Sequence, residues 1–446
     1  MKKVDERIIY FGRSIPQWTS FLRGRFQGNK FNQDVLWNFF SLAILATGGF
    51  LINLLIARFR GDEALGIFNQ VFAFYQILSQ FSVGGIHLSV LKEISYNQDD
   101  KQVCSSIMAS GLILVAAIAG ILSLVGYTFA QQIGELLQSK NVGIALQLAM
   151  PGLLVFSLNK VLLWTLNGLR YMRTYAVFQS MRYILLTGTI VGLIFMGVPN
   201  VVIPVALTLT ELIIFMILFP YVVTRLHLPE TLSKTFKWFP RHLSFGFRSF
   251  MSGALNEINT RVDVLMLGLF ASDSQVGIYS FASTLASGFL QLPMVLRWNL
   301  DPLLGAHFAK KEISSINDLV KKVRKYFYPV LVAICCLVVL TYPFIFSLLL
   351  KKSNIATASW EVFAILITGV LITSRFRPFY GILLQGGYPG THSLMIASLT
   401  IICVVLNLAL VPIFGIFGAA FSMTLMYSFE ATFLYFNTKR LFGIKL

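Results

Sequence analysis

The sequence predicts an all-α polytopic membrane protein with twelve transmembrane helices, arranged as two six-helix bundles related by a parallel repeat. Three observations predict this fold class. Hydrophobic residues make up 56% of the chain and charged residues only 12%, about half the charged share of a soluble domain. Apolar runs of roughly 20 residues, long enough to cross a bilayer as a helix, recur along the chain. One short motif also occurs twice, about half a chain length apart.

The first element is a basic arm, predicted over residues 1–34 on the cytoplasmic side. Between Arg7 and Phe31 this arm mixes aromatic and aliphatic residues with Arg and Lys. A basic amphipathic segment of this kind is typical of a helix that lies on anionic lipid, and docking to a partner protein is the alternative. A second segment, over residues 313–327, has the same pattern of apolar and basic residues.

Six spans are predicted in an N-terminal lobe, residues 35–223, and six in a C-terminal lobe, residues 244–436. The spans of the first lobe are expected near 35–57, 64–90, 105–129, 142–167, 176–196 and 201–223. Those of the second lobe are expected near 244–269, 276–300, 327–350, 358–385, 390–413 and 414–436. A cytoplasmic linker, 224–243, joins the lobes, and a cytoplasmic tail, 437–446, follows the last span.

The distribution of charge orients the chain in the membrane. The formal net charge is +17, which can indicate nucleic-acid binding or basic loops on the cytoplasmic side of a membrane. In the predicted topology, the side with both termini carries 24 basic residues and the other side five. The positive-inside rule therefore predicts cytoplasmic termini. Because this asymmetry accounts for most of the net charge, no nucleic-acid partner is expected.

The repeated motif has the same place in each lobe, where it closes the first span and opens the second. It reads "ARFRGDEALGIFNQ" from Ala57 and "GLFASDSQVGIYSF" from Gly268. Six spans per lobe is an even number, so both lobes start on the same side and the repeat is parallel. The glycine and the acid are expected to let two helices reverse tightly on the outer face. The four residues concerned are Asp62, Gly66, Asp273 and Gly277.

Both motifs, taken with the number and spacing of the spans, resemble the sequences of polysaccharide exporters. The matching stretches are "LLIARFRGDEALGIFNQVFAFYQIL" from Leu54 and "LNEINTRVDVLMLGLFASDSQVGIYSFASTLA" from Leu255. The family contains the O-antigen and lipid-linked oligosaccharide flippases of the multidrug/oligosaccharidyl-lipid/polysaccharide exporter superfamily. The resemblance extends over nearly the whole chain, although the long basic arm departs from the usual short start.

The resemblance implies a function, a location and a set of partners. It implies a flippase that moves an undecaprenyl-diphosphate-linked oligosaccharide from the cytoplasmic to the outer leaflet of the bacterial cytoplasmic (inner) membrane by alternating access. The family uses a cationic central cavity. Expected partners are the lipid-linked glycan, membrane lipids, and a polysaccharide polymerase with chain-length proteins. No cofactor is expected, and the four cysteines have no metal-ligand spacing.

Ionisable residues inside the predicted spans are candidates for the cavity, because such groups are costly in lipid and usually face water or substrate. The candidates for substrate binding are Lys160, Arg248, Asn256, Asn259, Arg261, Arg297, Arg375 and Arg377. The candidates for ion coupling are Glu211, Glu257, Asp263 and Glu430. Residues near span ends, such as Arg182 and Arg297, can instead extend to the interface.

The seventh span carries a polar stripe. At 100° per residue, Asn259, Thr260 and Asp263 fall within about 60° of Asn256. Glu257 and Arg261 flank this stripe four residues apart, so they can form an ion pair. The stripe is expected to face water or substrate, while a neutralised pair against a neighbouring helix is the alternative. The matching span of the first lobe has no such charge, so a special role in ion coupling or diphosphate contact is predicted for the C-terminal lobe.

The tenth span contains "SRFRPFYG". Pro378 is expected to kink this helix and to free backbone carbonyls. Arg375 and Arg377 at the kink could clamp a diphosphate bidentately. In a regular helix they would lie about 200° apart, so only one would reach the cavity.

The energy source and the rival functions can be weighed from the same residues. No "GxxxxGK[ST]" phosphate loop occurs, so an ion gradient or the substrate gradient must drive transport. An ion-coupled multidrug exporter of the same superfamily is the alternative function, but in-span basic residues outnumber acidic ones, seven to five. An enzyme is not expected, because the outer loops are short and no catalytic constellation occurs. A scaffold without a substrate would tolerate neutralisation of the in-span charges.

Overall fold

The computed structural model describes residues 30–229, 231–350 and 353–446, and within these ranges the regular elements are all helical. Residues 1–29, which form most of the predicted basic arm, lie outside the described part. The N-terminal lobe contains α2 (Lys30–Val83), α3 (Ile86–Tyr96), α4 (Lys101–Thr128), α5 (Ala130–Leu136), α6 (Lys140–Gly168), α7 (Met172–Phe195), η1 (Asn200–Val202) and α8 (Val205–Leu226). After α9 (Leu232–Phe236), the C-terminal lobe contains α10 (Phe239–Gly268), α11 (Asp273–Ala309), α12 (Ile313–Lys322), η2 (Val323–Phe327), α13 (Tyr328–Leu350), α14 (Ser353–Ser374), η3 (Arg377–Phe379), α15 (Ile382–Gln385), α16 (Pro389–Phe414) and α17 (Ile416–Phe442).

The first two spans are the two arms of α2, which reverses at Gly61. Gly61 has a left-handed φ of 89°, a conformation that glycine adopts at no steric cost. Asn69 donates a hydrogen bond to Oδ1 of Asn53 over 2.8 Å, and these residues are equally distant from Gly61 in sequence. The arms are therefore antiparallel. The sequence-based assignment of Gly66 to this turn was wrong, because Gly66 lies inside the second arm.

The twelve-span fold holds, although the spans differ in polarity. Eight helical segments in the described part of the chain are long and apolar enough to cross a membrane by length and composition, and one of them, 40–83, contains both arms of α2. The helices α10, α11 and α17 have 30, 37 and 27 residues, which is long enough for a span. These three helices are more polar in sequence, so they are not among the eight apolar segments.

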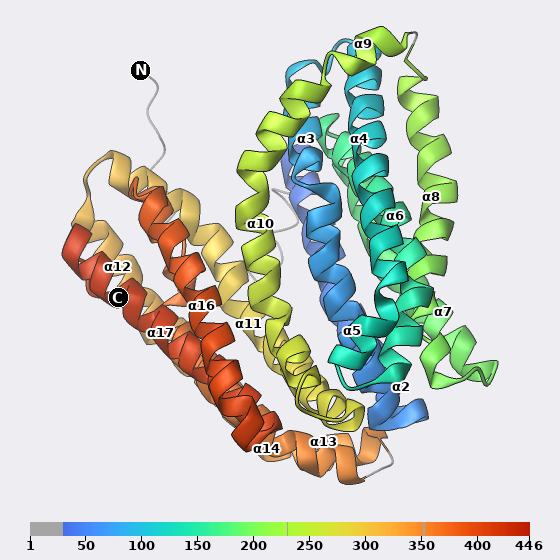
Figure 1. The fold of residues 1–446 in the computed structure, drawn as a ribbon. Coiled ribbons are helices and arrows are strands. Elements are labelled where there is room, and N and C mark those ends of the chain that lie inside the picture. The colour runs from blue at the N-terminus through green and yellow to red at the C-terminus, as the bar shows by residue number, and fades with distance from the viewer. Residues whose placement is uncertain (1–29, 230, 351–352) are drawn as a thin grey trace.

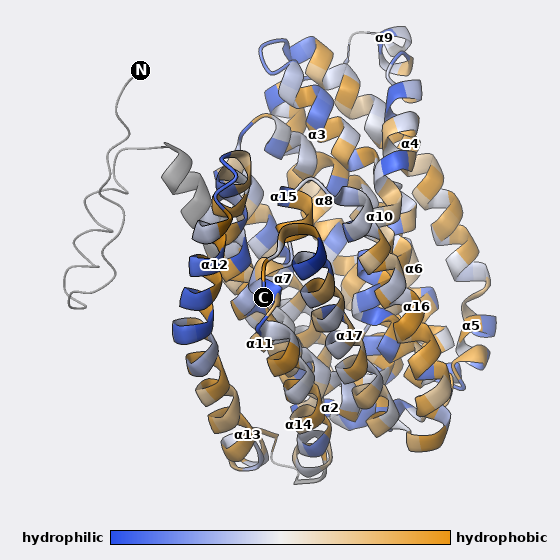
Figure 2. Ribbon diagram, turned by 90° about the vertical axis from the view of Figure 1, so that its left-hand side faces the viewer, coloured by the Kyte–Doolittle hydropathy of each residue, from blue (hydrophilic) through white to orange (hydrophobic). Residues whose placement is uncertain are grey.

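Apolar side chains cover the outside of the molecule, as lipid contact requires. Leu340, Phe344 and Phe195 are 78%, 76% and 76% exposed. Hydrophobic residues follow the long helices, whereas the blue colour marks much of α12 as hydrophilic (Figure 2). In α12 and η2 the apolar residues Ile316 and Val323 are buried within the protein. The basic side of this segment therefore remains as its outer surface, and its contact with anionic lipid stays a prediction.

Two of the predicted spans are interrupted. The second span ends at Val83, and Gly84 and Gly85, with φ of 52° and 73°, turn the chain into α3. A Cβ atom on Gly85 would lie 2.6 Å from the carbonyl oxygen of Gly246, so this break lets α3 approach α10 closely. The tenth span ends at Ser374, before η3 and α15. The predicted kink at Pro378 was therefore wrong. The helix stops at Ser374, because Pro378 has no N–H to donate to the carbonyl of Ser374 and its ring would clash with that carbonyl.

The two lobes meet at one end of the molecule and diverge at the other (Figure 1). We call the end that carries α9 and the α3–α4 turn the basic end, and the other the opposite end. At the basic end, α10 lies against the N-terminal lobe. There, His242 of α10 contacts the hydroxyl of Ser89 in α3 at 2.8 Å.

At the opposite end the two copies of the repeated motif contact each other. A Cβ atom on Gly66 would lie 1.7 Å from the carbonyl oxygen of Asp273, and one on Gly277 would lie 2.0 Å from that of Asp62. Hydrogen bonds follow the same reciprocal pattern: Ser274 donates to Asp62 over 2.8 Å, and Gln70 to Asp273 over 2.7 Å. We call this contact the repeat crossing. It holds α11 against the second arm of α2, and it explains why the motif occurs twice.

Candidate functional site

A polar cavity of about 280 Å³ lies in the C-terminal lobe. Its wall is formed by α10, α11, α16, α17 and the segment around η3. The lining residues are Asn256, Asn259, Thr260, Asp263, Ser283, Ser287, Leu290, Gln291, Met294, Arg297, Arg377, Tyr380, Leu399, Met423, Met426, Tyr427 and Glu430. The polar stripe of the seventh span, from Asn256 to Asp263, thus lines a cavity, as its periodicity predicted. We call this space the C-lobe cavity.

Asp263 is a buried acid of the C-lobe cavity. It is 1% exposed, as Glu430 is, and its Oδ2 accepts a hydrogen bond from the hydroxyl of Tyr279 over 2.5 Å. Its other oxygen, Oδ1, has no hydrogen-bond partner. No basic side chain of the described residues lies within 4 Å of it. A buried carboxylate without a cation either takes up a proton or binds a positive ion.

Both arginines of the C-lobe cavity are paired with carboxylates. Arg377 bonds to Glu430, whose second oxygen accepts from Thr373 over 2.8 Å. Arg297 Nε lies 3.2 Å from Oδ2 of Asp301 on the next turn of α11. The guanidinium groups of Arg297 and Arg377 lie 4.7 and 5.1 Å from the ring centre of Tyr380, which holds both by cation–π attraction.

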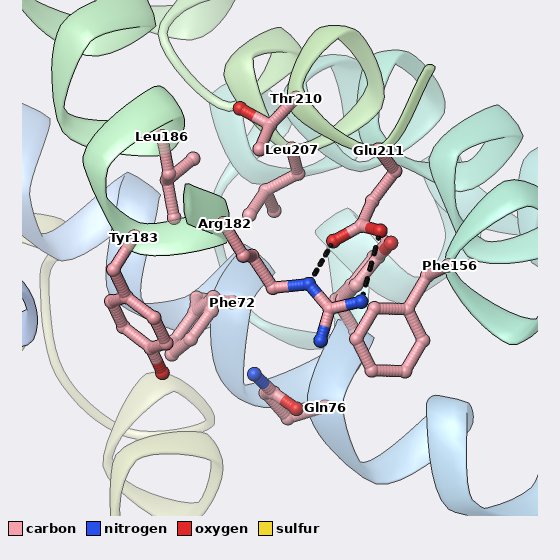
Figure 3. Close-up of a pocket in the computed structure, with 10 residues that line it drawn as sticks. Phe72, Gln76, Phe156, Arg182, Tyr183, Leu186, Leu207, Thr210 and Glu211 are labelled. Atoms are coloured by element: carbon pink, nitrogen blue, oxygen red, sulfur yellow. Dashed lines mark hydrogen bonds and ion pairs between the residues drawn. The ribbon is translucent and has the colours of Figure 1, made fainter. Parts of the chain in front are cut away.

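The N-terminal lobe has its own buried ion pair, between α7 and α8. Arg182 reaches Glu211 through Nε at 2.8 Å and through Nη2 at 3.2 Å, and Figure 3 shows both contacts beside the ring of Phe156. Asn159 also donates to the Glu211 carboxylate over 2.9 Å. The adjoining cavity of about 30 Å³ has room for only one or two waters. Both oxygens of Glu211 are thus engaged by partners within the N-terminal lobe.

Lys160, Glu257 and Arg261 lie between the lobes. Arg261 Nε is 3.6 Å from Glu257, which confirms the predicted pair, and its guanidinium lies 5.0 Å from the ring centre of Phe72 in α2. Lys160 Nζ lies 3.4 Å from the amide oxygen of Gln80. None of the described carboxylates comes within 4 Å of Lys160.

Two of the predicted binding residues, Arg248 and Arg375, lie apart from the other predicted binding residues. Arg248 is exposed and bonds to Ser244, one turn earlier in α10. Arg375 is exposed and lies against Phe376, with 5.8 Å between guanidinium carbon and ring centre. Neither lines the C-lobe cavity. Because α14 has ended at Ser374, the helical spacing that was assumed for Arg375 and Arg377 does not apply.

The structure also brings in residues that the sequence did not single out. Tyr380 and Tyr427 line the C-lobe cavity, and Asn159 completes the ion pair of the N-terminal lobe. A tyrosine or asparagine in a membrane span gives no strong signal, because packing explains either residue equally well. For Arg182 the sequence left open whether it extends to the interface, and the structure pairs it with Glu211 inside the lobe.

Comparison with known proteins places the chain in a family. The family model described as "Polysaccharide biosynthesis protein" matches residues 9–293 of the 446. The chain belongs to this family. A search of curated proteins finds no match. The solved structures that resemble this chain are described as a flippase and as transporters.

Solved structures share the fold of this polysaccharide biosynthesis protein. "Lipid II flippase MurJ, inward closed conformation" has 16% identity and a TM-score of 0.71, covering 91% of this chain and 87% of that one. An inward-facing multidrug resistance MATE family transporter of the MOP superfamily has 12% identity and a TM-score of 0.71; the match covers 89% of this chain and 94% of that one. An outward-facing MATE family transporter has 14% identity and a TM-score of 0.59; the match covers 93% of this chain and 96% of that one. The fold is that of a twelve-helix, multi-pass membrane transporter.

Proposed function

We propose that the protein is a flippase for an undecaprenyl-diphosphate-linked oligosaccharide, which it moves from the cytoplasmic to the outer leaflet by alternating access. The family and the transporter fold support transport in polysaccharide biosynthesis. The observation that carries the substrate class is Lys160. Its amino group lies between the lobes, contacts the amide oxygen of Gln80 over 3.4 Å and has no carboxylate of the described residues within 4 Å.

The charge of Lys160 suits a diphosphate. An ammonium group held away from water binds a phosphate oxygen strongly, because little solvent screens the attraction. Arg261 is the second cation between the lobes, and its pair with Glu257 at 3.6 Å is long enough to open for a stronger anion. Arg182, in contrast, is held bidentately by Glu211 and is not free to bind phosphate.

Substitution of Lys160 tests this proposal. We expect Lys160→Gln to slow flipping of a fluorescent undecaprenyl-diphosphate oligosaccharide in proteoliposomes by about tenfold or more, since a lost charged contact is worth that factor. Lys140→Gln, which neutralises an exposed lysine at the opposite end, is the matched control and should flip normally. Equal rates for the wild type and Lys160→Gln would overturn the assignment of the diphosphate to Lys160.

Ion coupling is part of the proposal, and Asp263 is its carrier. Glu211, Glu257 and Glu430 are each held by an arginine. Asp263 is the one predicted coupling residue that lacks a basic partner. A carboxylate of this kind can exchange a proton or a monovalent cation as the cavity opens and closes.

A multidrug exporter is the second candidate function. It is favoured by the same unpaired Asp263 and by three methionines in the C-lobe cavity, Met294, Met423 and Met426, because thioether side chains adapt to varied apolar ligands. Binding of a cationic dye such as ethidium to the purified protein separates the two functions. Micromolar binding of the dye that Asp263→Asn removes, with no binding of undecaprenyl diphosphate, would support the exporter.

The location and partners remain part of the proposal. The basic residues on one side support cytoplasmic termini in a bacterial cytoplasmic membrane. A flipped lipid-linked glycan must be consumed outside, so a polysaccharide polymerase with chain-length proteins would act next. A reporter fused to the C-terminus that is active only in the cytoplasm tests the orientation.

A further inference from the structure

We infer that the C-lobe cavity binds the uncharged sugar part of the substrate, so that sugar and diphosphate occupy separate subsites in the two lobes. The inference rests on the proposed function and deepens it. Lys160 of the N-terminal lobe would hold the diphosphate. The amides and hydroxyl groups that line the C-lobe cavity would hold the sugar next to it.

The charges of the C-lobe cavity argue against a phosphate there. Arg377 is bonded to Glu430, and Arg297 to Asp301. Asp263 adds a negative charge without a basic partner. The cavity therefore offers no uncompensated positive charge, and a diphosphate inside it would meet two carboxylates of the lining, Asp263 and Glu430. A neutral group meets no such penalty.

The polar lining suits hydroxyl groups. Asn256, Asn259 and Gln291 offer amide donors and acceptors, and Thr260, Ser283, Ser287, Tyr380 and Tyr427 offer hydroxyls. A sugar hydroxyl donates one hydrogen bond and accepts others, so it pairs with either kind of group. An arginine paired with a carboxylate also presents a donor and an acceptor side by side, which matches two neighbouring hydroxyls of a sugar ring.

Unpartnered acceptors point to a ligand that donates hydrogen bonds. Oδ1 of Asp263 and Oδ1 of Asn259 are buried acceptors without a hydrogen-bond partner, and Nε of Arg377 is a buried donor without one. All three residues line the C-lobe cavity, and a hydroxyl group, which donates and accepts, can serve both kinds of atom. Buried polar atoms of native proteins almost always find a partner. Donation from a hydroxyl would satisfy both oxygens, whereas a phosphate, which is an acceptor at neutral pH, would satisfy neither.

The size of the cavity limits what enters it. Small-molecule sites usually have about 300–1,000 Å³, and the C-lobe cavity has about 280 Å³. It therefore has room for a small group such as one or two sugar rings, and not for a whole lipid-linked oligosaccharide. The rest of the substrate must lie between the lobes, on the side of Lys160.

Binding measurements on the full-length protein in nanodiscs test the inference. The probes are undecaprenyl diphosphate and the same lipid with one N-acetylhexosamine or one hexose, and native mass spectrometry gives each Kd. We expect Asn259→Ala and Gln291→Ala to raise the Kd of the preferred glycosylated lipid about tenfold, the factor for one good hydrogen bond. The Kd of undecaprenyl diphosphate should change less than twofold. Lys160→Gln should weaken all three lipids alike.

The controls distinguish failure of the sugar subsite from failure of the proposed flippase function. Asn299→Ala removes an exposed amide of α11 outside the cavity lining and should bind every lipid as the wild type does, and thermal unfolding verifies that each variant is folded. Equal binding of glycosylated and bare lipid by the wild type, or equal weakening of both by Asn259→Ala, overturns the sugar subsite and leaves the flippase intact. Failure of the wild type to bind any of the three lipids defeats the proposed function, and the sugar subsite with it.

Discussion

Asp263 is buried in the C-lobe cavity and has a hydroxyl partner, Tyr279, in place of a basic one. The hydroxyl of Tyr279 donates a side-chain hydrogen bond to the carboxylate over 2.5 Å. Such a group gains or loses a cation more easily than a paired acid when its surroundings change, because no basic side chain of the described residues lies within 4 Å of it. The paired acids Glu211 and Glu430 have arginines at hydrogen-bonding distance and lack this freedom.

Asp263→Asn is therefore expected to separate coupling from binding. The amide keeps the size of the side chain and can still bond to Tyr279, but it carries no charge to exchange. In proteoliposomes, an imposed proton or sodium gradient should accelerate flipping by the wild type and leave the rate of Asp263→Asn unchanged. Binding of undecaprenyl diphosphate, which rests on Lys160, should persist.

Glu257→Gln is the control for this residue-level prediction, because Glu257 is already paired with Arg261 at 3.6 Å. Its flipping should still respond to the gradient. A gradient response that survives in Asp263→Asn and disappears in Glu257→Gln would move the coupling role from the C-lobe cavity to the space between the lobes.

Sequence spacing predicted ion pairs only where they are local. Glu257 and Arg261 are four residues apart in one helix, so the helical period alone gave their pair, which the structure confirms. Arg182 and Glu211 lie on neighbouring helices, and Arg377 and Glu430 are joined across 53 residues. No period connects such residues, because their distance depends on how the helices pack. The sequence therefore indicated the candidates for the site but not their partners.

At the scale of elements, the repeat crossing depends on two glycines with no room for a side chain. Gly277 lies inside α11, where a Cβ atom would be 2.0 Å from the backbone oxygen of Asp62. Backbone cannot rotate away as a side chain does, so one methyl group forces the two helices apart. The sequence showed that the motif was repeated, but a contact between the copies could not be predicted from it, because it arises only when the two lobes assemble.

Gly277→Ala is expected to weaken the contact between α11 and α2 and to reduce flipping at least tenfold. Helix propensity alone would make alanine favourable by about 1 kcal/mol, so any loss must come from the contact. Gly288→Ala lies on the same helix, where a Cβ atom would meet nothing within 4 Å, and should flip normally. The measurement is flipping in proteoliposomes at matched protein content. Similar loss in both variants would assign the effect to α11 itself rather than to the repeat crossing.

At the scale of the whole molecule, the proposed alternating access would have the two lobes rock against each other around the repeat crossing. The lobes meet at the opposite end and diverge at the basic end (Figure 1). The TM-score is accordingly higher against the inward-facing transporter, 0.71, than against the outward-facing one, 0.59. The number of spans and the parallel repeat were predictable, because apolar length and the spacing of two motifs are properties of the chain. The separation of the lobes was not, since it is one of several arrangements that the same helices allow.

Alternating access therefore predicts opposite changes of distance at the two ends of the molecule. One spin-label pair would join Tyr96 in α3 to Phe436 in α17, at the basic end, and another would join Leu136 in α5 to Leu348 in α13, at the opposite end. All four side chains are more than 60% exposed, and the four native cysteines would first be replaced by alanine. Relative to the wild type, Gly277→Ala should shorten the first distance and lengthen the second, because the added methyl group disfavours closure of the opposite end. Pulsed electron–electron double resonance measures both distributions, and Gly288→Ala should reproduce those of the wild type. If Gly277→Ala lengthened both distances, the lobes would be separating rather than rocking. The repeat crossing would then hold the lobes together without acting as a pivot.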